Sequence, residues 1–134
     1  MNIVAYCIRL PQIEKDLKAL SKRFKSASND LVHVERLLEV GYKLPQTDQY
    51  TGFGENHNIF KTRVINTNTN KGKSSGYRLI YEEISNSREK QILLIFLYDK
   101  HTCNNEGKVR IEVKTRLHSP EYQTLTCVSN GSSS

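Results

Sequence analysis

The stretch of sequence that decides the fold is Ser74-Ser75-Gly76-Tyr77-Arg78-Leu79-Ile80-Tyr81-Glu82-Glu83-Ile84. Residues 77–84 are rich in aromatic and β-branched side chains, which favours a strand. A charged turn follows at 85–91, and the next run, 92–98, is apolar at consecutive positions, as expected for a strand buried on both faces of a sheet. We therefore expect a β-hairpin from 77 to 98, with the rest of the chain arranged around it.

One strand and two helices are predicted before this hairpin. Residues 2–8 form a short run of β-forming residues, and Pro11 then suits the first turn of a helix. The apolar side chains of this helix recur at i, i+4, i+7 and i+11: Ile13, Leu17, Leu20 and Phe24. Ser28 or Asn29 can cap a second helix that ends at Gly41. We expect the two helices to form a hairpin on one face of a small antiparallel sheet, which makes the fold class α+β.

A basic strand is predicted between the helices and the β-hairpin. Residues 42–58 show little periodicity and read as a surface connection, in which we expect His57 to be solvated. In the strand at 59–65, Lys61 and Arg63 share one face because alternate residues of a strand point the same way. An exposed sheet face and a phosphate-binding face both fit this pattern.

The segment after the β-hairpin fits two structures. Val109, Ile111 and Val113 alternate with charged residues, which indicates an amphipathic strand. Val109, Val113 and Leu117 also recur at i, i+4 and i+8, which indicates a helix, so periodicity leaves 105–118 open. We expect one domain over 1–128 and a flexible tail at 129–134.

Composition favours a basic protein without a metal or disulfide framework. The formal net charge of the 134 residues is +6, and such a surface attracts polyanions, among which nucleic acid is common. The three cysteines are widely spaced and form no zinc-binding pattern. No apolar run has the length of a membrane span. We expect a cytoplasmic protein that needs no cofactor and contacts no membrane.

Lysines follow one side of the first predicted helix. They recur opposite its apolar stripe, at about 100° per residue: Lys15, Lys18, Lys22 and Lys25. A solvated charged face is the ordinary interpretation of such a pattern. Contact with a phosphate backbone is the functional one.

Several motifs resemble the RelE/ParE superfamily of toxins from type II toxin–antitoxin pairs. They are, in chain order, Asp16-Leu17-Lys18-Ala19-Leu20-Ser21-Lys22, Phe60-Lys61-Thr62-Arg63-Val64, Ser75-Gly76-Tyr77-Arg78-Leu79-Ile80-Tyr81 and Leu97-Tyr98-Asp99-Lys100. The loop Lys71-Gly72-Lys73-Ser74 is similar to that of the HigB-like branch. The resemblance covers about residues 3–103 and rests on the order and spacing of the motifs.

The resemblance implies a RelE-like fold and a metal-independent endoribonuclease that cuts mRNA, in many members on the ribosome. The ribose 2′-hydroxyl would attack the adjacent phosphate, which needs a base, positive charge on the phosphorane and an acid. Lys61 is the candidate base, on the premise that neighbouring cations depress its pKa. Arg63 and Arg78 would hold the phosphate, Lys100 matches a family cation, and His101 is our candidate proton donor.

Further RNA contacts, partners and alternatives complete the prediction. The residues assigned to RNA binding are Lys18, Lys22, Lys71, Lys73 and Tyr98. The expected partners are mRNA, the ribosome and an antitoxin whose acidic segment covers the cations. The chain departs from the family in lacking a tyrosine at the expected distance after Lys100. The alternatives are a ParE-like toxin that inhibits DNA gyrase without nuclease chemistry, and a basic RNA-binding module.

Overall fold

The predicted β-hairpin forms the centre of a five-stranded sheet. The computed structural model describes residues 4–68 and 76–131, with the backbone alone for 127–131. Strand β4 (Tyr77–Ser85) runs antiparallel to β5 (Glu89–Tyr98), and the charged turn is shorter than expected because both strands extend into it. Every residue of β5 from Gln91 to Tyr98 is buried, as predicted for a central strand.

The sheet is mixed, so the prediction of an antiparallel sheet is wrong in one strand. The order is β1-β5-β4-β3-β2, where β1 spans Val4–Arg9, β2 Asp48–Gln49 and β3 Ile59–Val64. Strand β1 lies parallel to β5, with Val4 opposite Glu89 and Arg9 opposite Leu94. A parallel pair needs a long connection, and the chain between these two strands includes two helices and three strands.

The two expected N-terminal helices form, at α1 (Gln12–Ser21) and α2 (Ala27–Glu39), but the cap expected at Ser28 or Asn29 is wrong because α2 begins earlier, with Ser26 at its N-cap. The apolar stripe of α1 is buried at Ile13, Leu17 and Leu20. Gly41, just after α2, has φ of 84°, a left-handed conformation that favours glycine and ends a helix. Val34 of α2 and Val64 of β3 line a common groove, and the ring of Phe24 meets that of Tyr77 edge-on at 6.0 Å. The helical hairpin of α1 and α2 therefore packs on the face of the sheet that carries Val64 and Tyr77.

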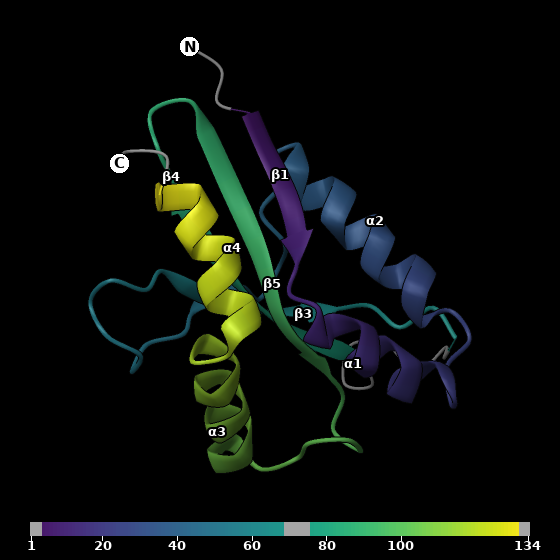
Figure 1. Ribbon diagram of the computed structural model, residues 1–134. Coiled ribbons are helices and arrows are strands. Elements are labelled where there is room, and N and C mark those ends of the chain that lie inside the picture. Colours follow the sequence, from purple (N-terminus) through teal and green to yellow (C-terminus); the bar gives the residue numbers. More distant parts are fainter. Residues whose placement is uncertain (1–3, 69–75, 132–134) are drawn as a thin grey trace.

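The ambiguous C-terminal segment is helical. Helix α3 (Glu106–Leu117) begins at Asn105, whose side chain accepts a hydrogen bond from the backbone of Lys108. Ile111, which would have faced inward in a strand, is 65% exposed, whereas Val109 and Val113 are buried. A further helix, α4 (Pro120–Gly131), was not predicted; it includes the first residues of the expected tail, and 132–134 lie outside the described residues. Figure 1 shows α3 and α4 end to end in front of the sheet.

A buried ion pair joins the two helical layers at the edge of β5. The Arg116 guanidinium donates to both carboxylate oxygens of Asp16, at 2.7 and 2.8 Å. Asp16 also accepts from the backbone N–H of Leu97, and Arg116 donates to the carbonyl of Ile95. Strand β1 pairs with β5 only as far as Leu94, so this pair satisfies backbone groups of β5 that lie beyond the end of β1.

Within the described residues, no helix combines the length and the apolar character that crossing a membrane requires.

Candidate functional site

Two arginines and a tyrosine lie side by side across three strands. In the strand register, Arg63 of β3 is opposite Arg78 of β4, and Arg78 is opposite Tyr98 of β5. Directly opposed residues share a face of a sheet, so these side chains lie on the face opposite to Val64 and Tyr77. Arg78 donates to the carbonyl of Gly76 at 2.8 Å. Burial, and after it the positive charge of Arg63, lower the pKa of Arg78.

Lys61 is on the same face of β3, two residues before Arg63, but its environment differs from the expected one. Its ammonium lies 3.1 Å from Oε1 of Glu106 at the start of α3 and interacts with the Tyr98 hydroxyl. Burial lowers the pKa of Lys61, but Tyr98 and Glu106 together outweigh it and the pKa is raised. The premise that neighbouring cations depress this pKa is therefore wrong. Lys61 is suited to hold an anion and poorly suited to accept a proton at neutral pH.

Two aromatic side chains, Tyr50 and Phe53, lie beside the Lys61–Glu106 pair. Tyr50, directly after β2, donates its hydroxyl hydrogen to Oε2 of Glu106 in a short hydrogen bond. The guanidinium of Arg110 stacks over the rings of Tyr50 and Phe53, at 4.5 and 5.5 Å from their centroids, and donates to the carbonyl of Thr51 at 2.7 Å. These contacts attach the loop after β2 to α3 beside the cations.

The other predicted site residues are more dispersed. Lys100 and His101 are exposed in the turn after β5. Tyr98 is only 4% exposed and its ring stacks on Phe96 at 4.8 Å, so it cannot stack on a base in this conformation. Of the other predicted RNA contacts, Lys18 in α1 and Lys22 at its C-cap are exposed, and Lys71 and Lys73 lie outside the described residues.

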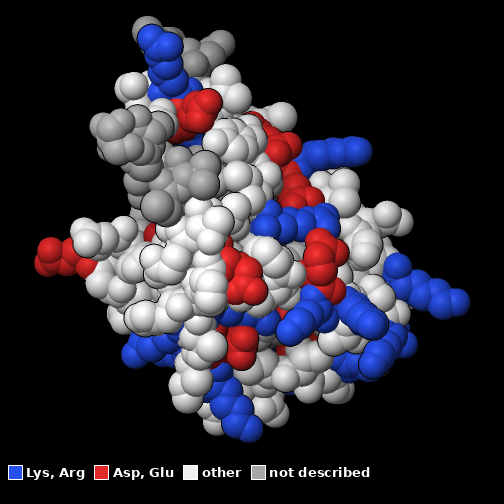
Figure 2. Space-filling view, viewed as in Figure 1, with Lys and Arg blue, Asp and Glu red and all other residues white. Residues whose placement is uncertain are grey.

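Basic side chains are not confined to this cluster. Figure 2 shows Lys and Arg gathered over the lower right of the molecule, where α1 lies in Figure 1, with acidic side chains between them on the rest of this face. The expected lysine face is only partly helical: Lys15 and Lys18 of α1 and Lys22 at its C-cap are exposed, whereas Lys25 lies beyond the end of the helix. Both the solvated and the phosphate-binding interpretations of that face remain compatible with this arrangement.

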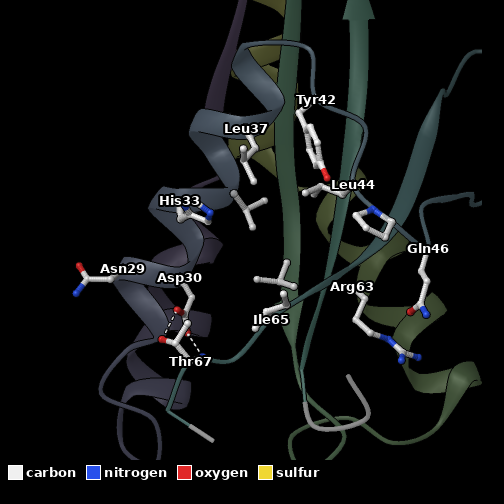
Figure 3. A pocket seen from close by; sticks show the side chains of 13 residues that line it. Asn29, Asp30, His33, Leu37, Tyr42, Leu44, Gln46, Arg63, Ile65 and Thr67 are labelled. Carbon is white, nitrogen blue, oxygen red and sulfur yellow. Dashed lines mark hydrogen bonds between the residues drawn. The ribbon is translucent and has the colours of Figure 1, made fainter. Parts of the chain in front are cut away.

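An apolar groove of about 590 Å³ lies between α2 and β3. Leu37 and Tyr42 border it on one side and Ile65 on the other, while Arg63 lies at its rim (Figure 3). Ile65 is 71% exposed and Tyr42 50% exposed, unusual values for large apolar side chains that face a groove. Through Arg63 the groove borders the arginine pair of the sheet.

Sequence reasoning missed a buried polar cluster built around Glu82. This carboxylate is 2% exposed, accepts from the Tyr122 hydroxyl at 2.6 Å and lies 2.9 Å from Nδ1 of His57. The expectation that His57 is solvated is therefore wrong: it is half-buried in a hydrogen-bonded cluster. One signal was available, because Glu82 alternates with Ile80 on a buried face of β4, where an unpaired carboxylate would be costly.

The residues that the structure describes contain no group of three or more His, Cys, Asp or Glu side chains placed to hold a metal ion. Comparison with models of protein families, with curated proteins and with solved structures gives no significant match to this chain. The family assignment therefore stays a resemblance carried by the sequence motifs.

Proposed function

We propose that this protein is the toxin of a type II toxin–antitoxin pair and cleaves mRNA as a metal-independent endoribonuclease, on the ribosome. The observation that carries the proposal is the cross-strand pairing of Arg63 with Arg78, with Lys61 on the same face. The forked donors of two neighbouring guanidinium groups match the oxygens of a phosphate.

The proposed reaction uses these cations for charge and alignment. The 2′-oxygen forms a bond to the adjacent phosphorus as the bond from phosphorus to the 5′-oxygen breaks, which leaves a cyclic phosphate and a free 5′-hydroxyl. Arg63, Arg78 and the protonated Lys61 stabilise the negative phosphorane. The 2′-hydroxyl proton passes to water, and His101 is the candidate donor to the leaving oxygen. Alignment of mRNA by the ribosome supplies much of the acceleration in this scheme.

The test is induction of the chain in cells that lack its antitoxin. Translation should stop, and primer extension should detect cut mRNA. The double variant Lys61→Ala, Arg78→Ala should relieve the arrest while its circular dichroism spectrum stays that of the wild type. A double variant that folds and is still fully toxic would reject the assigned site. Loss of DNA supercoiling with intact mRNA would instead favour the gyrase-inhibitor alternative.

The groove between α2 and β3 is the proposed seat of the antitoxin. An acidic, amphipathic segment fits best, because the chain has a net charge of +6 and Arg63 lies at the rim of the groove, whose lining is largely apolar apart from Asp30 and a few polar side chains. Ile65→Glu should weaken capture of the antitoxin, and folding should tolerate it since Ile65 is 71% exposed. Unchanged affinity of this variant for the antitoxin would place the contact elsewhere.

A further inference from the structure

Glu106 brings a carboxylate into the cation cluster from another layer of the fold. Its Oε1 accepts from the ammonium of Lys61 at 3.1 Å, and its Oε2 accepts from the hydroxyl of Tyr50. Nε of Arg110 lies 3.4 Å from the same Oε2. Donors from β3, from the loop after β2 and from α3 therefore converge on one carboxylate.

The donors that hold Glu106 are those that a phosphate group would use. Two anionic oxygens meet an ammonium, a guanidinium and the Tyr50 hydroxyl, and the Lys61 and Arg110 cations lie over the ring of Tyr50, at 5.4 and 4.5 Å from its centroid. The contact is open to exchange, because the Glu106 side chain is 52% exposed. Burial raises the pKa of Glu106, but Tyr50, Lys61 and Arg110 outweigh it and lower the pKa, so the carboxylate is ionised at neutral pH.

This contact is continuous with the proposed phosphate site. Lys61 interacts with the Tyr98 hydroxyl, and Tyr98 is the register partner of Arg78. A second acidic residue of α3, Glu112, is directed elsewhere and lies 2.8 Å from Arg116. The competing charge at Lys61 therefore comes from the first turn of α3 and not from acidic residues of this helix in general.

We propose that Glu106 is an internal competitor of the RNA phosphate, which occupies Lys61 in the free protein and must be displaced when RNA binds. The proposal rests on the proposed function, because it assumes that RNA binds at Lys61, Arg63 and Arg78. Displacement releases the first turn of α3 from β3 and lets Lys61 turn its charge to the phosphate. Glu106 thereby sets the affinity of the free toxin for RNA.

The experiment measures binding of a fluorescent single-stranded RNA oligonucleotide to the full chain by anisotropy at fixed salt. Glu106→Gln keeps the size of the side chain and an acceptor for Tyr50 but removes the charge. It should tighten binding by roughly two- to fivefold, the size expected for one exposed charge pair. Glu121→Gln is the matched control: Glu121 is exposed in the first turn of α4 and carries the same charge. This control should bind RNA as the wild type does.

Further variants distinguish failure of the competitor role from failure of the proposed function. In a Lys61→Ala chain, Glu106→Gln should no longer change the affinity, because the group it competes for is gone. If Arg78→Ala weakens RNA binding but Glu106→Gln binds no tighter than the wild type, the competitor role is rejected and the proposed function stands. If neither the wild type nor Glu106→Gln binds RNA, Lys61 has no RNA phosphate to exchange in the free protein and the competitor role is rejected; retained arrest on induction in cells would then show that the proposed function stands without it.

Discussion

Gly76, in the stretch that decides the fold, is required by a close backbone contact. A Cβ at this position would lie 2.4 Å from the carbonyl oxygen of Val64, a backbone atom held in the β3–β4 ladder. Gly76→Ala should therefore destabilise the fold by about 1–3 kcal/mol, the usual cost of forcing an extra methyl into a packed site. Urea denaturation followed by circular dichroism measures this loss.

Gly107→Ala is the control for that substitution. The Cβ would lie 3.0 Å from Oδ1 of Asn105, the capping oxygen of α3, so a small shift of this side chain is needed; alanine is the better helix former by roughly 0.5–1 kcal/mol, which offsets a weaker cap. This variant should unfold at nearly the wild-type urea concentration. If Gly76→Ala does the same, the close contact does not constrain the motif.

Side-chain chemistry at the site was only partly predictable from sequence. The period-2 pattern placed Lys61 and Arg63 on one face, and their strand forms as expected. The pKa of Lys61 was mispredicted because Glu106 is 45 residues away in sequence and belongs to a segment whose structure periodicity left open. For the same reason the sequence did not connect His57 with Glu82 and Tyr122. His57 lies in a loop, Glu82 in a strand and Tyr122 in a helix that was not predicted.

At the scale of elements, the edge of β5 depends on one ion pair. Asp16 and Arg116 are 8% and 6% exposed, and they join α1, α3 and β5. Asp16→Ala would remove the buried carboxylate partner of Arg116 and leave it only the more exposed Glu112, so we expect a loss of about 3 kcal/mol in the free energy of unfolding, the lower end for a broken buried pair. The exposed pair of Arg9 with Glu14 is the comparison: Glu14→Gln should cost less than about 1 kcal/mol. Equal effects in urea denaturation would show that burial does not matter here.

The hydrogen bond from the Tyr122 hydroxyl to Glu82 attaches α4 to the sheet. Tyr122→Phe removes the donor to Glu82 while it keeps the ring, and a buried acceptor that loses a partner costs about 1–3 kcal/mol. Hydrogen exchange should become faster at the backbone amides of α4 and stay unchanged in β4 and β5. Unchanged exchange in α4 would mean that its apolar contacts suffice. Thr126→Val, which removes a hydroxyl bonded within α4 itself, is the control.

Element order was predictable where local signals were strong. The hairpin 77–98 and helices α1 and α2 follow from periodicity, proline and glycine positions. The parallel alignment of β1 was not predictable from the sequence. It depends on which edge of the β-hairpin the first strand joins, and residues 2–8 carry no pattern that selects between the edges. Helix α4 was missed since its 120–131 sequence has little apolar periodicity and is rich in Ser and Thr.

For the whole molecule, the decisive question is whether the basic face of α1 contributes to RNA binding. If Lys18 and Lys22 contact phosphates, Lys18→Ala with Lys22→Ala should reduce the slope of log affinity against log salt by about 1.4, or about 0.7 for each contact with single-stranded RNA. Both side chains are exposed, so folding should be unaffected. Anisotropy titrations at several salt concentrations give the slope.

The control pair is Lys43→Ala with Arg88→Ala, which removes the same charge from the loop after α2 and from the β4–β5 turn. If RNA contacts α1 specifically, the slope of log affinity against log salt should be unchanged in this control pair and reduced in the Lys18/Lys22 pair. Equal small losses in both would assign the α1 lysines to an ordinary solvated face. Arg78→Ala provides the other limit, because it should abolish cleavage at every salt concentration, whereas the α1 pair should weaken binding and leave cleavage of saturated RNA intact.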